Sequence, residues 1–410
     1  MASTLHPRLL EYDSLKARLE FKPYEFIVNE TSYRLGIYRD YGEHDVPGAH
    51  RRENEQGGIK MDLDQYGFYD SAANEATTPG DIQIRGENLR SPHGSHDEEG
   101  INRLEARVKG LSFLLARKRG EHVGPPPADE SDEVYIIIAV FENMDVKHIQ
   151  FMHDGLQKNL LPYLYRRTGT MPPYKKFVQL NISGQWTLSH NFQKGSRLDQ
   201  MQKNLTDVLF GHRSAEINVN HLIVDYHYFT IRLPPGLKIR IRELSMDRNE
   251  LGVYNQLDLI IDPSSIPLKV ARVGQVLEHP LITRSTRLEL YVLEDFEAFQ
   301  KVCGGEVTVT FCHLSSENYV ELVENMLDHP RDTGTYMRFG HFREERVFAE
   351  TILRALETRF DNVKLGPRSV TIPMKNNQQQ IVVSHDHTPH ECEFFPQWCI
   401  VINVEEVEEE

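Results

Sequence analysis

Between Ala215 and Leu314 the sequence alternates apolar and polar residues in several short runs. In a β-strand, successive side chains point to opposite faces, so each run predicts a strand with one buried and one exposed face. Stretches rich in proline, glycine or serine separate the runs at intervals typical of a sandwich or barrel. The pattern favours antiparallel strands, because antiparallel sheets are commonly buried on one face only. The runs are 238–242, 257–262, 288–292 and 307–311.

The flanking regions add helices and further strands. Apolar residues from Ile101 to Leu115 recur on one helical stripe, whereas 134–141 is continuously apolar, as expected of a strand covered on both faces. We therefore predict a mainly β fold with inserted helices (α+β) around an antiparallel sandwich or jelly-roll-like core. Strands are expected at 24–29, 33–38, 82–85, 134–141, 177–180, 185–189, 370–374, 381–384 and 398–404, and helices at 101–119, up to 161, 198–208, 316–328 and 343–361.

Three segments are predicted along the chain. Residues 1–124 hold an N-terminal hairpin, a long polar loop and a helix, and residues 125–214 a mixed strand and helix segment. Residues 215–410 hold the β-rich core, two inserted helices and an acidic tail. The boundary at 124/125 rests on a run of three prolines that stiffens the chain.

Composition excludes some functions. The net charge of -15 argues against coating nucleic acid, because phosphate neutralisation needs an excess of Lys and Arg. The first residues lack an apolar signal-peptide core, and no stretch of about 18 apolar residues occurs. We therefore expect a protein of the virion or of the host cytoplasm or nucleus, with no membrane partner and no secretion by a signal peptide.

A His-rich segment is the sharpest candidate for chemistry. Zinc binds imidazole and thiolate ligands, and histidines two residues apart on a strand share a face. The alternative is a solvated turn between two strands, because structural zinc sites usually combine two separated ligand pairs. With no catalytic motif elsewhere, we expect no enzyme activity and no cofactor other than zinc. The candidate metal ligands are His385, His387, His390 and Cys392.

The expected β core with inserted helices and long loops resembles the jelly-roll shell proteins of viruses, of the capsid, penton or occlusion-matrix type. That resemblance implies a non-enzymatic, self-assembling structural protein that forms a homo-oligomer or lattice. We expect its contacts to come from segments 42–100 and 333–342, which are long, polar and carry aromatic residues. Two alternatives stay open: a cytosolic or nuclear interaction module, and a metal-dependent enzyme using the His-rich segment.

Overall fold

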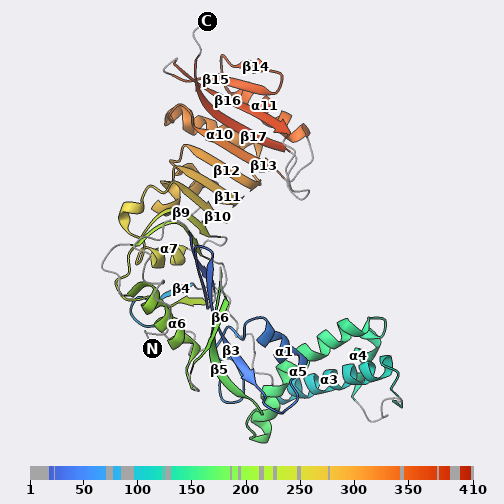
Figure 1. Cartoon of the computed structure of the whole chain (residues 1–410). Helices are drawn as coiled ribbons and strands as arrows, with labels where there is room; N and C mark the ends of the chain where they lie inside the picture. Colours follow the sequence, from blue (N-terminus) through green and yellow to red (C-terminus); the bar gives the residue numbers. More distant parts are fainter. Residues whose placement is uncertain are drawn as a thin grey trace.

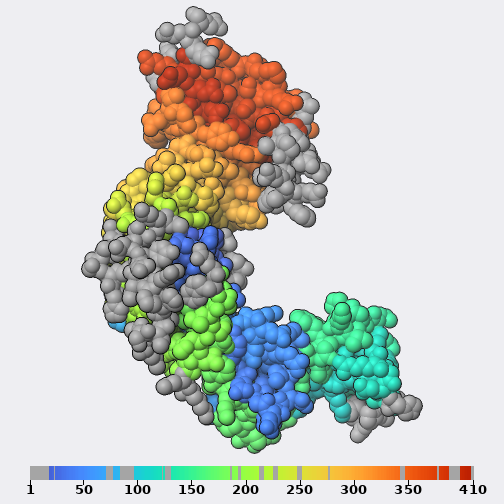
Figure 2. All heavy atoms as spheres, in the orientation of Figure 1, coloured from blue at the N-terminus to red at the C-terminus, as the bar shows by residue number. Residues whose placement is uncertain are grey.

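The chain folds into a long arc (Figure 1). The C-terminal strands after residue 364 occupy one end, and the helices between residues 98 and 168 project from the other. Figure 2 shows the surface hollowed on one side between these two arms. The computed structural model describes residues 18–22, 24–70, 77–84, 97–121, 123–124, 131–184, 187–192, 195–211, 217–224, 229–246, 251–275, 278–341, 346–375, 378–387 and 398–407.

Within these residues, fifteen strands form one continuous sheet and two more pair separately. The sheet takes strands from all three predicted segments, since residues 18–21 pair with residues 221–224, and residues 32–40 pair with residues 175–183. In sheet order the strands are β14 (Lys364–Gly366), β15 (Ser369–Pro373), β16 (Gln379–His387), β17 (Trp398–Glu406), β13 (Tyr336–His341), β12 (Glu306–Cys312), β11 (Arg287–Leu293), β10 (Val270–Val273), β9 (Ile239–Met246), β7 (Ile217–Val224), β1 (Arg18–Lys22), β2 (Glu25–Val28), β3 (Thr31–Asp40), β5 (Lys175–Ser183) and β6 (Thr187–Asn191), while β4 (Ile82–Ile84) pairs with β8 (Phe229–Ile231).

Helices lie between and beside the strands, so the fold is mixed α/β and rich in strands, which is consistent with the predicted α+β class. The expected N-terminal hairpin, the closing antiparallel strands and the helices near 101–119, 198–208, 316–328 and 343–361 are confirmed. The described helices are α1 (Gly48–Glu55), α3 (Glu98–Lys118), α4 (Asp132–Phe141), α5 (Val146–Thr168), α6 (Leu198–Thr206), α7 (Leu251–Leu257), α8 (Pro280–Thr283), α9 (Phe296–Gln300), α10 (Ser316–Asp328) and α11 (Arg346–Arg359).

The strands β7, β9, β10, β11, β12 and β13, here called the parallel block, all run in the same direction. The expected antiparallel sandwich or jelly-roll-like core is therefore wrong for this part of the chain. Alternation of apolar and polar residues indicates that one face of a strand is buried, but it does not indicate the direction of the neighbouring strands. Parallel neighbours need connections of about a dozen residues or more. Residues 247–269, 274–286, 294–305 and 313–335 are such connections. The run 257–262, predicted as a strand, lies in the first of them: Leu257 ends α7, a turn follows, and Ile261 forms an isolated bridge to Ile239.

Buried side chains on one face of the parallel block line up in two columns across the strands. Each new strand adds to the side of the previous one and extends both columns, as in repeat proteins whose units bury their apolar faces on one another. All members are at most 5% exposed, so the scaffold is well packed. The columns are Leu222, Leu244, Ala271, Leu288, Val307 and Met337, and Val224, Met246, Val273, Leu290, Val309 and Phe339.

Two local predictions between residues 131 and 168 are wrong. The apolar run 134–141 forms helix α4 and not a buried strand. Ser131, Asp132 and Glu133 precede the run, and acidic residues in a first turn favour a helix. Helix α5 also continues through Pro162, which was expected to end it, up to the left-handed cap at Gly169. A short apolar run cannot by itself distinguish a strand from a helix.

Helices α3, α4 and α5 form a unit with small cores of their own. Leu111, Leu114 and Leu115 of α3 pack with Ile137 of α4 and Ile149 of α5. The unit joins the sheet through α1, which contacts both α5 and β3. None of the described helices combines the length and the apolar character needed to cross a bilayer.

The segment 333–342, expected to be a polar loop at a subunit contact, mostly forms β13. This strand lies inside the sheet between β12 and β17. Met337 and Phe339 are fully buried there, so these side chains are not available to a partner. The alternating pattern of a short strand was hidden by the adjoining glycines and charged residues. In segment 42–100, α1 and β4 are ordered elements, and Phe68 packs edge-on against Tyr163 of α5.

Candidate functional site

The face of the parallel block opposite the two buried columns carries charged side chains. We call it the open face and define it by Glu243, Arg272, Arg287, Glu289 and Glu306. These residues occupy outward positions on β9, β10, β11 and β12, next to one another in the sheet register. Their side chains are between 27% and 44% exposed. The strand alternation that buries the columns therefore places a row of charges on the other side.

The arginines and glutamates of the open face form a continuous chain of ion pairs from β9 to β12. Arg272 reaches Glu243 and Glu289 at 2.9 Å each, and Arg287 reaches Glu289 at 2.9 Å and Glu306 at 3.3 Å. The hydrogen bond from Arg272 holds the pKa of Glu243 below its usual value, although partial burial opposes this effect. Exposed pairs add little stability singly, but a network fixes the position of both guanidinium groups.

An aromatic side chain extends the open face. Tyr291 follows Arg287 and Glu289 at outward positions of β11 and is 58% exposed. Its ring packs edge-on against the ring of Phe311 in β12, with centroids 4.9 Å apart. Tyr and Arg are the residue types enriched in binding hot spots. The open face thus combines an anchored aromatic ring with two positioned guanidinium groups.

The open face continues toward β1 through His221 of β7. The Nε2 atom of His221 lies 2.7 Å from the hydroxyl oxygen of Ser245 on β9. Burial and the neighbouring Arg272 lower the pKa of His221. On β1, the buried carboxylate of Glu20 pairs with Arg18 at 2.6 Å and with Lys22 at 2.7 Å. Paired polar groups therefore extend across six neighbouring strands, β1, β7, β9, β10, β11 and β12.

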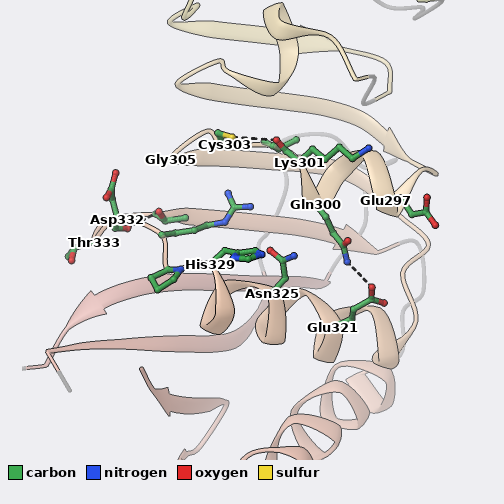
Figure 3. A pocket seen from close by; sticks show the side chains of 15 residues that line it. Glu297, Gln300, Lys301, Cys303, Gly305, Glu321, Asn325, His329, Asp332 and Thr333 are labelled. Atoms are coloured by element: carbon green, nitrogen blue, oxygen red, sulfur yellow. Dashed lines mark hydrogen bonds between the residues drawn. The ribbon is translucent and has the colours of Figure 1, made fainter. Parts of the chain in front are cut away.

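A groove of about 850 Å³ lies between α9, α10 and the loops that precede β12 and β13 (Figure 3). Gln300 and Glu321 meet across it through a 2.8 Å hydrogen bond. Asn325 and His329 line it from the side of α10. Arg331 also lines the groove and is half-buried, and this burial lowers the pKa of its guanidinium. The lining suits hydrogen bonding to a polar ligand better than burial of an apolar one.

The His-rich segment begins at the end of β16. His385 is only 5% exposed, and its ring packs against Trp398 of β17 with centroids 5.5 Å apart. His390, Cys392 and the side chain of His387 lie outside the described residues. Among the residues that the structure describes, no group of three or more His, Cys, Asp or Glu side chains is placed to hold a metal ion. The two expectations for this segment, a zinc site or a turn without metal, are therefore separated by elemental analysis.

The open face was not predicted as a site from the sequence. The outward positions of the run 288–292 were expected only to form the exposed face of a strand. The available signal was the tyrosine at position 291, because a large aromatic at an outward position between charged residues is unusual for a purely solvated face. The position of Arg272 opposite Glu289 depends on the parallel register, which the sequence does not specify.

Comparison with known proteins gives one match. A family model described as a domain of unknown function (DUF3557) matches residues 197–343. No curated protein and no solved structure matched the chain. The matched region begins at the first residue before α6, ends just after β13, and covers little more than a third of the chain. It contains the whole parallel block, and so both the open face and the groove belong to the region that the family model describes.

Proposed function

We propose that the protein is a non-enzymatic interaction protein that binds a protein partner on its open face. The observation that carries the proposal is Tyr291, whose ring is more than half exposed at the centre of a well-packed sheet. Phe311 packs against the ring from one side, and Arg272 and Arg287 on the same face of the sheet are fixed by ion pairs. A preorganised aromatic anchor with positioned guanidinium groups loses little conformational freedom on binding.

The shape of the chain supports this proposal. Repeat-like parallel sheets present extended surfaces on a stiff scaffold, and such proteins use those surfaces for binding. The parallel block also coincides with the region matched by the family model. The role as a viral structural protein stays a prediction, and the parallel block does not supply the jelly-roll architecture from which that role was inferred.

The proposal is tested by enrichment of partners from an extract of cells that make the protein. Wild type, Tyr291→Ala and Leu365→Ala serve as baits, followed by affinity measurement for any protein that wild type retains. Leu365 is the matched control, because it is 59% exposed on the distant edge strand β14. We expect Tyr291→Ala to weaken binding about thirtyfold, the effect of a hot-spot side chain, and Leu365→Ala to leave it unchanged. Equal retention by all three baits would contradict the proposal.

A further inference from the structure

The projecting helical unit carries an exposed apolar stripe, separate from the open face. The stripe consists of Tyr135, Ile136, Val140 and Met144, which we call the α4 patch. Their exposed fractions are 40%, 53%, 59% and 42%. Ile136 and Val140 lie four residues apart on one face of α4, Tyr135 adjoins them, and Met144 follows in the turn after the helix.

Helix α4 is held firmly beneath this patch. Its inner residues Val134 and Ile137 are buried against α3. The two helices approach closely at Gly110, where an added Cβ atom would lie 3.0 Å from the carbonyl oxygen of Val134. Ion pairs from α3 fix both ends of α4, at Glu133 and at Glu142. The patch is therefore preformed, and its apolar side chains do not turn inward to cover themselves.

The apolar area suits a specific interface. A large apolar side chain exposes about 150–250 Å² when free, so four half-exposed ones offer about 400 Å². This lies in the range of the largest patches on monomers, which often mark interaction sites. Apolar atoms make up about 60% of an interface, so an apolar area of about 400 Å² corresponds to a full contact area of roughly 650 Å² on each partner. Two such faces bury about 1,300 Å² in total, which reaches the size of stable protein interfaces.

The charges around the patch fit a second copy of the same chain. Exposed Asp132 marks the N-terminal end of α4. Exposed Lys118 and Lys147 lie at the other end, where α3 ends and α5 begins, and the acidic residues there, Glu142 and Asp145, pair with Arg117 and His148 of the same copy. When two copies pack with their α4 helices antiparallel, each acidic end meets the basic end of the other copy. A two-fold axis makes both contacts at once, because an isologous interface repeats every pair.

From these observations we propose that the α4 patch is a homodimer interface in which α4 packs antiparallel to α4 of a second copy. This inference does not rest on the proposed function, because the α4 patch and the open face lie on different parts of the chain. The dimer would present two open faces to a partner, which raises the apparent affinity for a bivalent target.

The experiment measures the mass of the full chain by light scattering and sedimentation over a range of concentrations. We expect wild type to dimerise with a micromolar dissociation constant, and Ile136→Glu to be monomeric at the highest soluble concentration. Leu259→Glu, at a position 60% exposed in the loop after α7, is the matched control and should dimerise like wild type. Equal circular dichroism spectra verify that both variants fold. Monomeric wild type, or a dimer that Ile136→Glu leaves intact, would overturn the proposal.

A charge exchange tests the antiparallel arrangement. Asp132→Lys and Lys147→Asp place like charges together at the proposed contacts, so each alone should weaken dimerisation several-fold. The double variant restores opposite charges and should recover most of the lost affinity. Restoration requires that the two residues meet across the axis, since within one copy they lie at opposite ends of α4. Additive losses in the double variant would refute the antiparallel dimer.

Discussion

Leu288→Ala tests which face of the parallel block is buried. Leu288 is fully buried in the first column, between Ala271 on β10 and Val307 on β12. The substitution removes three methylene-sized groups, which weakens hydrophobic stabilisation by about 2.4 kcal/mol at about 0.8 kcal/mol per group. Ala271 is small and Val307 is stiff at its branched Cβ, so neither can fill the space.

The remaining cavity adds a second contribution. A residual volume of roughly 60 Å³ at about 24 cal/mol per Å³ destabilises the fold by about 1.5 kcal/mol more. The total is about 4 kcal/mol, within the range of about 2–5 kcal/mol for buried Leu→Ala changes. Tyr291→Ala, three residues along the same strand, removes a larger side chain from an exposed position. We expect it to cost about 1 kcal/mol, mainly from the edge contact with Phe311.

Urea unfolding followed by circular dichroism measures both changes, with the free-energy difference taken from the shift of the midpoint and the slope. We expect Leu288→Ala to lower the free energy of unfolding clearly more than Tyr291→Ala does, although Tyr291 has the larger side chain. Equal losses for the two variants would refute the assignment of the two faces. So would a loss below about 1 kcal/mol for Leu288→Ala, because that value is typical of an exposed site.

Three further predictions follow from other contacts. Asp81 is buried and pairs with Arg232 at 2.9 Å, so Asp81→Asn should destabilise the protein by about 3–5 kcal/mol in thermal or urea unfolding. Burial raises the pKa of Asp81, but hydrogen bonds from Lys203, Thr78 and Arg232 outweigh it, so the pKa is lowered. The stabilising effect of Asp81 is therefore complete above the unfolded-state pKa near ~3.9 and is lost as the pH falls below it, a difference that acid titration of wild type and Asp81→Asn should show. Glu289→Cys combined with Thr308→Cys should form a disulfide, because the two positions are register partners on β11 and β12. Mass spectrometry in a Cys303→Ser background detects the bond, and a pair that stays reduced under oxidant contradicts the parallel register. Elemental analysis should find less than one zinc per chain, because His385 is buried against an aromatic ring; stoichiometric zinc would refute this expectation.

Local elements were largely predictable from the sequence. Helix α10 begins and ends at the expected residues, because Ser315 caps its N-terminus together with Asn318. Strands β15, β16 and β17 were also expected, and alternation predicted which of their side chains are buried. These features depend on neighbouring residues, so the sequence contains the relevant information directly.

Strand direction and partner choice could not be predicted in the same way. The outward and inward positions of β11 are the same whether its neighbours run parallel or antiparallel. The unequal lengths of the connections also hid the repeated addition of strands, because no fixed period marks them. Helix α6 illustrates a further limit: Asp62, far away in sequence, accepts a 2.8 Å hydrogen bond from the backbone nitrogen of Leu198 at its first turn. Prediction of the open face would have required strand direction, strand order and contacts between residues that are distant in sequence.

Site-specific photo-crosslinking at position 291 tests the central claim most directly. The chain carries a photoreactive phenylalanine derivative in place of Tyr291, or, as control, in place of Leu365, which is equally exposed on β14. After irradiation in an extract of cells that make the protein, a defined covalent adduct should form from position 291 and be absent from position 365. No adduct from position 291, or the same adducts from both positions, would contradict the claim that the open face is the binding surface.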